Sequence, residues 1–171
     1  MPKDNTCINC ASIFNEYPHA TAMIRGSADY PSIWGVAHFY QTNMGVLMAI
    51  EITGLPTSEN RCESPVFGFH IHNGMSCTGT DEDPFANAGT HYNPYNCAHP
   101  HHAGDLPPLF GNNGYAFLAF FTDRFEVSEI IGRTIVVHSM PDDFTTQPAG
   151  NSGAKIACGV IYSSDLSRPR S

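Results

Sequence analysis

The segment VFGFHIH, residues 66–72, restricts the fold of this sequence more than any other feature. Its residues alternate in character, as they do in a β-strand whose successive side chains point to opposite faces. With this period, the two phenylalanines and Ile71 lie on one face, while His70 and His72 lie on the other. The segment therefore predicts a strand that presents two imidazoles on the same side.

Six further segments have the composition of strands, because they are rich in β-branched and aromatic residues and are separated by Gly, Pro and Asn. They are residues 20–24, 35–41, 45–53, 115–122, 134–138 and 155–162. The sequence Thr-Asn-Met-Gly at 42–45 indicates a hairpin between the second and third of these. No segment has the period of a helix. About seven or eight short strands predict an all-β domain, built as a sandwich or a barrel.

The composition agrees with one β-domain. Of the 171 residues, 42% are hydrophobic and only 14% are charged, and the chain contains 15 Gly and 13 Pro. A length near ~150 residues is typical of one domain, and abundant Gly and Pro favour turns and ordered loops over helices. We expect a domain over residues 19–163, with tails at 1–18 and 164–171. Two long loops, 73–108 and 139–154, interrupt the strands, and the first is long enough to indicate a function.

The charge of the chain argues against two classes of partner. Eight basic and 16 acidic residues give a net charge of -8 with His neutral, whereas nucleic acids and anionic membranes bind basic surfaces. No apolar run reaches the ~20 residues of a membrane helix. We therefore expect no nucleic-acid partner and no membrane partner. The first residues, MPKDN, lack the apolar stretch of a signal peptide, so we expect a cytoplasmic location, or an extracytoplasmic one if a signal has been removed.

The histidines are unevenly distributed, since seven of the nine lie between His70 and His138. His19 and His38 lie apart from this group and are expected to be ordinary polar residues. The grouped histidines, together with Asp105, provide imidazoles for two metal ions and one carboxylate ligand. Copper and zinc suit such nitrogen-rich sites, whereas calcium and magnesium prefer oxygen ligands. The sequence therefore predicts a copper or zinc site.

Five ordered groups of residues resemble those of the copper/zinc superoxide dismutases. They are GFHIH at 68–72, AGTHYNP at 88–94, HAGDL at 102–106, IGRTIVVH at 131–138, and GNSG at 150–153 followed by ACGVI at 157–161. The resemblance covers roughly residues 20–162. It implies a Greek-key β-sandwich, a flattened eight-stranded barrel with two long functional loops. It also implies an enzyme that converts the superoxide anion to oxygen and hydrogen peroxide, with a homodimer as one assembly open to it.

The resemblance assigns roles to single residues. Copper would be held by His70, His72, His91 and His138, and zinc by His91, His99, His102 and Asp105. His91 would bridge the two metals and carry a proton in catalysis, while copper alternates between Cu(II) and Cu(I). Asp142 would link copper-side and zinc-side histidines, and such outer partners fix the orientation of ligand rings. Cys77 and Cys158 occupy the positions of the family's disulfide.

Two residues depart from the family's pattern. Only two positions separate His99 from His102, so His101 is an alternative zinc ligand. Lys155 stands where the family has an arginine near the active site, and we expect its charge to attract superoxide. The short zinc loop and the surplus of His and Cys leave two other functions open. One is a non-catalytic module that binds copper or zinc for storage, delivery or structure, and the other is a copper-only dismutase.

Four cysteines remain outside the implied disulfide. Cys62 and Cys97 either form a second disulfide or are free thiols. Cys7 and Cys10 form a Cys-x-x-Cys motif, which is half of a zinc site, a redox pair or two unpaired residues in a tail.

Overall fold

The computed structural model describes residues 10–63 and 65–164. The strands in this part of the chain are β1 (Ala20–Gly26), β2 (Trp34–Gln41), β3 (Val46–Thr53), β4 (Val66–Phe67), β5 (Phe69–His72), β6 (Leu109–Phe110), β7 (Ala116–Thr122), β8 (Thr134–His138) and β9 (Lys155–Ser163). Two four-residue helices, α1 (Cys10–Ile13) and α2 (Val127–Ile130), and two short 3-10 turns, Arg61–Glu63 and Ala86–Ala88, complete these elements. The predicted all-β class is confirmed.

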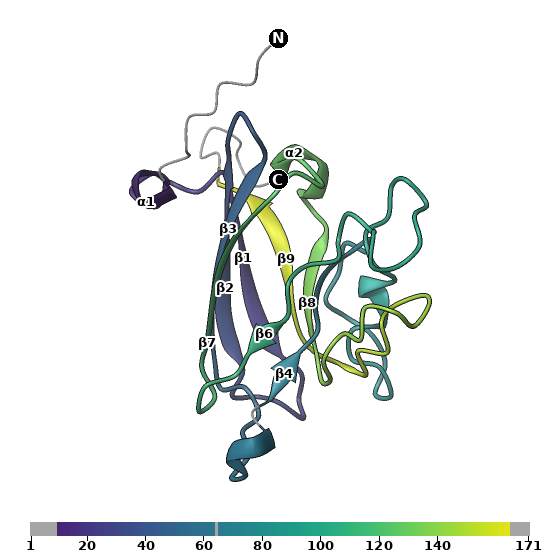
Figure 1. The fold of residues 1–171 in the computed structure, drawn as a ribbon. Coiled ribbons are helices and arrows are strands. Elements are labelled where there is room, and N and C mark those ends of the chain that lie inside the picture. The colour runs from purple at the N-terminus through teal and green to yellow at the C-terminus, as the bar shows by residue number, and fades with distance from the viewer. Residues whose placement is uncertain (1–9, 64, 165–171) are drawn as a thin grey trace.

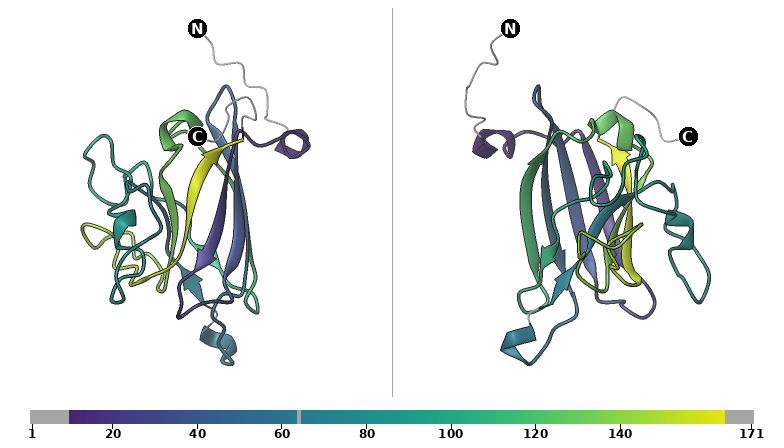
Figure 2. Two further views of the ribbon diagram at one scale, coloured as in Figure 1. Left: turned by 180° about the vertical axis from the view of Figure 1, so that it is seen from behind. Right: turned by 45° about the vertical axis from the view of Figure 1, so that its right-hand side comes forward.

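Seven of the strands form one antiparallel sheet in the order β5-β8-β9-β1-β2-β3-β7. This sheet is curled, and the short pair β4-β6 lies across its hollow side (Figures 1 and 2). The core fills the space between them, because β4 contributes Phe67, β6 contributes Leu109, and the sheet contributes residues such as Ile24, Phe39 and Ile50. The loops at 73–108 and 139–154 both lie beside β8, outside the barrel (Figure 1).

The segment 66–72, predicted as one strand, is two strands separated by Gly68. The Gly68 N–H donates to the carbonyl of Met140, and its carbonyl accepts from the N–H of His138. A Cβ at this position would lie 2.8 Å from the side chain of Ser152. The chain therefore changes strand partner at Gly68, because β4 pairs with β6 whereas β5 pairs with β8. The close approach of Ser152 to Gly68 requires a residue without a side chain.

The two helices were not predicted, because four residues are too few to show a helical period. The first turn of α2 is capped by Glu126 and Glu129, and the Glu126 N–H donates to the Glu129 carboxylate at 2.7 Å. Within the predicted N-terminal tail, the ring of Phe14 meets Tyr40 edge-on at 5.8 Å between centroids. Among the described residues, no helix has the length and apolar character needed to cross a membrane.

Candidate metal centre

Two sheet strands and two loops bring the predicted ligands together on the outer side of the barrel. His70 and His72 lie on β5, and His138 ends β8, which pairs with β5. The loop 73–108 folds back along β5, because the Ile71 N–H donates to Gly104 and the Tyr92 N–H donates to Ile71. This return places His91, His99, His102 and Asp105 over the histidine face, while the loop 139–154 adds Asp142. All of these side chains are buried.

One cluster consists of His70, His72, His91 and His138, whose ligand atoms all lie within 4.8 Å of one another. Three of the rings are oriented by acceptors behind them. His72 Nδ1 donates to the carbonyl of Gly89 at 2.8 Å, and His138 Nδ1 donates to the carbonyl of Gly153 at 3.3 Å. His70 Nε2 donates to Asp142 at 2.7 Å. Because a carbonyl or carboxylate only accepts, the other nitrogen of each ring carries a lone pair that can bind a metal, and two of these nitrogens, Nε2 of His72 and Nε2 of His138, face each other at 3.1 Å.

A second cluster consists of His91, His99, His102 and Asp105, again with ligand atoms within 4.8 Å of one another. The carboxylate of Asp105 lies at its centre, 2.7 Å from His91 Nδ1, 3.1 Å from His99 Nδ1 and 3.3 Å from His102 Nδ1. The backbone N–H of His102 also donates to this carboxylate at 3.0 Å. His91 belongs to both clusters, so one imidazole lies between them.

Asp142 joins the two clusters from behind. One of its carboxylate oxygens accepts from His70 Nε2 at 2.7 Å, and the other accepts from His99 Nε2 at 2.9 Å. The N–H of Phe144 donates to the second oxygen at 2.7 Å and fixes the carboxylate in its own loop. One ring from each cluster is therefore held by the same side chain.

Burial and hydrogen bonds together set the protonation states of these groups. It lowers the pKa of His70 and His72, and burial together with the neighbouring His70 lowers the pKa of His138 to about 3. Burial alone would raise the pKa of Asp142, but the hydrogen bonds from His70 and Phe144 prevail and lower it to about 2. At neutral pH these imidazoles are neutral and Asp142 is ionised, which is the state required for metal binding.

The clusters fit two metal ions of the expected kind. Four buried ring nitrogens make no hydrogen bond: Nδ1 of His70, Nε2 of His91, and Nδ1 of His99 and His102. Unpartnered buried polar atoms are costly, and a metal ion in each cluster would satisfy them. Four imidazole nitrogens in one cluster suit copper, and three imidazoles with one carboxylate in the other suit zinc.

The structure corrects the alternative zinc ligand. His101 is exposed and belongs to neither cluster. Its backbone N–H donates to the carbonyl of Ala98, in a turn that leaves the side chain outside while His99 and His102 are buried around Asp105. The short spacing between His99 and His102 is therefore sufficient for both to reach the carboxylate.

Lys155 lies beside the first cluster. A shift in register between β8 and β9 places it opposite His138. It lines a cavity of about 370 Å³ together with Thr90 and with three histidines of the first cluster, His72, His91 and His138. Its ammonium forms an ion pair with Asp83, which sequence reasoning did not identify. The expected cation is therefore present, but a carboxylate of the loop partly neutralises it.

The four cysteines whose side chains the structure describes form one bonded pair and two free thiols. Cys77 and Cys158 form a disulfide that joins the loop 73–108 to β9. Cys62 and Cys97 are exposed and unbonded, so the alternative of a second disulfide is wrong. They belong to separate turns: Cys62 lies in the 3-10 turn before β4, whereas Cys97 is held by backbone hydrogen bonds to the side chain of Asn93. The Cys-x-x-Cys motif begins with Cys7, outside the described residues.

Comparison with known proteins identifies the family. The model of the copper/zinc superoxide dismutase family matches residues 33–161. The chain belongs to this family. A copper/zinc superoxide dismutase of Deinococcus radiodurans is 36% identical over 147 residues, covering 75% of this chain and 77% of the relative. Another, from Legionella pneumophila, is 34% identical over 150 residues, covering 82% and 85%. This superoxide dismutase therefore uses copper and zinc as its cofactors and superoxide as its substrate.

Two arginines near the metal centre were not predicted as functional residues. Arg124 donates to three carbonyls of the loop that carries His102 and Asp105. Arg133 lies over the ring of Tyr92 at 4.2 Å and donates to Asn73. Only Arg133 belongs to a family motif, and neither contact is visible in sequence, because each joins segments that are distant along the chain.

Proposed function

We propose that copper in this superoxide dismutase is held by His70, His72, His91 and His138, and zinc by His91, His99, His102 and Asp105. The observation that carries the proposal is the position of His91. Its Nε2 lies in the first cluster without a hydrogen bond, and its Nδ1 lies in the second, 2.7 Å from Asp105. The two nitrogens of one buried ring thus serve two separate donor sets, each completed by three other residues.

Backbone groups around the first cluster orient its imidazole rings, and one of these imidazoles is placed to transfer a proton. When bound, copper supplies a one-electron couple, oxidising one superoxide to oxygen and reducing the next to hydrogen peroxide with the uptake of two protons. Nε2 of His91 is the atom placed to take up and release one of these protons, because His91 lines the cavity, its Nε2 makes no hydrogen bond and its ring is anchored through Nδ1. Gly89 and Gly153 keep the rings of His72 and His138 in the tautomer that leaves Nε2 free.

The cavity above the first cluster is the route by which we expect superoxide to enter. Its volume of about 370 Å³ exceeds what a diatomic anion needs, and His72, His91 and His138 lie in its wall. Lys155 supplies positive charge at this wall, and its ammonium also disfavours a protonated His138. We assign Lys155 the role of attracting the anion, with Asp83 reducing its effect.

Substitutions of three histidines test the ligand assignment. His138→Ala is expected to abolish copper binding and dismutase activity, and His102→Ala to remove zinc while leaving copper bound. His101→Ala is the matched control, because this exposed residue lies between two proposed zinc ligands, and it should leave both metals and activity unchanged. Metal content per chain and the rate of superoxide removal are the measurements. Full activity in His138→Ala would overturn the assignment, and wild-type protein that binds both metals without turnover would support the storage or delivery alternative.

A further inference from the structure

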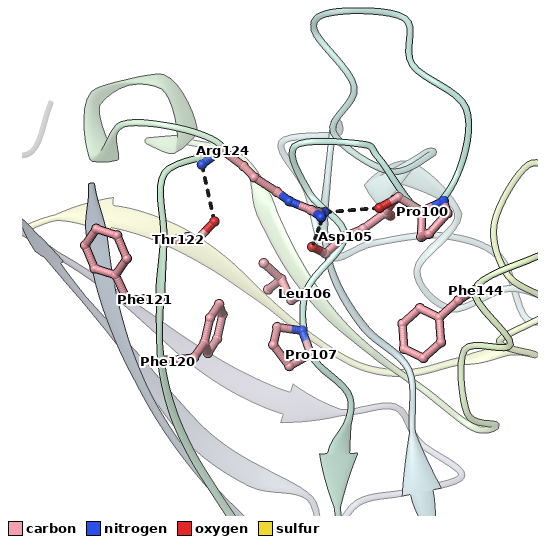
Figure 3. A pocket seen from close by; sticks show the side chains of 9 residues that line it. All are labelled: Pro100, Asp105, Leu106, Pro107, Phe120, Phe121, Thr122, Arg124 and Phe144. Carbon is pink, nitrogen blue, oxygen red and sulfur yellow. Dashed lines mark hydrogen bonds between the residues drawn. The ribbon is translucent and has the colours of Figure 1, made fainter. Parts of the chain in front are cut away.

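The side chain of Arg124 connects the barrel to the loop that carries the proposed zinc ligands. Arg124 follows the end of β7, where its backbone N–H donates to Thr122 at 3.3 Å. Its guanidinium extends across to the loop (Figure 3). Nη1 donates to the carbonyls of Pro100, His102 and Asp105 at 3.1, 3.2 and 3.1 Å. The segment that follows β7 thus holds a loop that lies 19 to 24 residues earlier in the chain.

The three carbonyls lie within residues 99–105, the short segment that carries three of the four residues of the second cluster. Two of them belong to His102 and Asp105 themselves, and the third belongs to Pro100, which follows His99. The internal turn in this segment is small, since the Asp105 N–H donates to the carbonyl of His102 at 3.2 Å. The two N–H groups of Nη1 are shared among three acceptors, so one planar group draws these carbonyls to a common point.

The guanidinium contacts the backbone of Asp105 and leaves its carboxylate to the imidazoles. The side-chain oxygens of Asp105 face His91, His99 and His102. Arg124 therefore does not compete with a metal for this carboxylate. On its outer side, Arg124 borders a cavity of about 330 Å³ together with Phe120, Phe121 and Phe144 (Figure 3). This cavity is lined by residues other than those of the cavity that contains Lys155.

We propose that Arg124 is a positioning residue for zinc. By fixing the carbonyls of Pro100, His102 and Asp105, it holds the imidazole of His102 and the carboxylate of Asp105 in their ligating arrangement before the metal binds. The loop then loses less conformational freedom on binding zinc than an untethered loop would lose. The inference rests on the proposed zinc ligand set.

Three variants of the full-length chain separate this role from general stability. Arg124→Met keeps the length of the side chain but removes the donors, and Arg124→Lys keeps the charge and some donors. Arg25→Met is the matched control, because Arg25 is an exposed arginine on β1 whose guanidinium lies over Trp34 at 5.5 Å. Arg25→Met removes one positive charge, as Arg124→Met does, but from another part of the barrel.

Zinc affinity is measured by competition with a chromophoric chelator, and copper affinity in the same way. Arg124→Met is expected to bind zinc about tenfold or more weakly, as variants of residues that orient metal ligands do, while its copper affinity stays near that of the wild type. Arg124→Lys should recover part of the loss. With cobalt(II) as a probe, the visible absorption of the second cluster should weaken and broaden in Arg124→Met alone.

The outcomes distinguish this proposal from the ligand assignment. Wild-type zinc affinity in Arg124→Met, or an equal loss of zinc and copper affinity, overturns the positioning role. If Arg124→Met fails to fold, Arg124→Lys is measured instead. Wild-type zinc affinity and an unchanged cobalt spectrum in that variant would overturn the positioning role. Retention of zinc by His102→Ala would instead overturn the ligand assignment itself.

Discussion

Gly150 lies at the point where the backbone of the second loop comes closest to the carboxylate that joins the two clusters. It has a φ of +66°, in the region that favours glycine. A Cβ here would lie 2.0 Å from a carboxylate oxygen of Asp142 and 2.6 Å from His99 Nε2. No rotation of a flexible side chain relieves this overlap, because both partners are buried and hydrogen-bonded to each other.

We therefore expect Gly150→Ala to displace Asp142 and to weaken the binding of both metals. The reason is that Asp142 orients His70 in one cluster and His99 in the other. The loss in affinity should be about tenfold or more for zinc. It is measured by chelator competition, together with the melting temperature of the metal-free protein.

Gly132→Ala is the control for this substitution. Gly132 has a φ of +83°, and a Cβ there would meet only the end of the Met75 side chain, at 3.2 Å. It carries a comparable backbone strain, of about 1–3 kcal/mol, away from Asp142. Equal metal affinities in the two variants would show that strain, and not contact with Asp142, determines the effect.

Residues differ in how far the sequence reveals their role. His70 and His72 could be placed on one face by alternation alone, and Asp142 through its position in the resemblance to the family. Gly150 also lies in a family motif, but its contact with Asp142 depends on how the second loop folds. Arg124 acts through backbone carbonyls, which carry no sequence signature, so its role becomes visible only in three dimensions.

At the scale of elements, β5 shows why the first loop is essential. All four of its residues are buried, although alternation predicts only one buried face. The core covers one side, and the loop 73–108 covers the other. The carbonyl of Gly89 in this loop orients His72, and the loop is joined to β9 through Cys77 and Cys158. The disulfide therefore supports a hydrogen bond in the metal centre as well as the loop itself.

Replacement of Cys77 and Cys158 by alanine should lower the free energy of unfolding. The bond closes a segment with a sequence separation of 81 residues, for which the chain-entropy model gives about 4.5 kcal/mol, and removal of a native disulfide typically costs about 2–5 kcal/mol. Urea unfolding of the metal-free protein measures the change. Cys97→Ser, at an exposed free thiol, is the control and should leave stability unchanged. A double variant as stable as the wild type would contradict the expectation.

The elements themselves were predicted unevenly. The longer strands, such as β2 and β3, follow directly from their β-branched and aromatic composition. The break at Gly68 could not be predicted, because it arises from pairing with the distant Met140 and from the proximity of Ser152. The short β6 gives no periodic signal, having two residues.

For the whole molecule, electrostatics sets the rate at which an anionic substrate arrives. The chain has a net charge of -8 and therefore repels superoxide at long range. Under the role proposed above, Lys155 would counter this repulsion locally, and its ion pair with Asp83 would limit the field that it creates in the cavity. The balance between these two residues is thus expected to tune the second-order rate constant.

Removal of the charge of Lys155 and removal of the charge of Asp83 are expected to change the second-order rate constant in opposite directions. Lys155→Ala should lower the second-order rate constant at low ionic strength, and Asp83→Asn should raise it, each by about twofold or more, with both differences shrinking as salt shortens the Debye length. The rate of superoxide removal across a salt series measures this. Asp29→Asn, at an exposed position between β1 and β2, changes the net charge equally and should have a smaller effect. If Asp83→Asn and Asp29→Asn share one rate and one salt dependence, net charge guides the substrate and the ion pair of Lys155 with Asp83 does not.

The carboxylate of Asp142 also has a thermodynamic consequence. Because it holds His70 on one side and His99 on the other, ordering either ring orders the shared carboxylate and prepares the second ring. His91, common to both clusters, couples them a second time. Linkage then requires reciprocity: copper must increase the affinity for zinc by the same factor by which zinc increases the affinity for copper. We therefore expect the two metals to bind the wild-type protein with positive cooperativity.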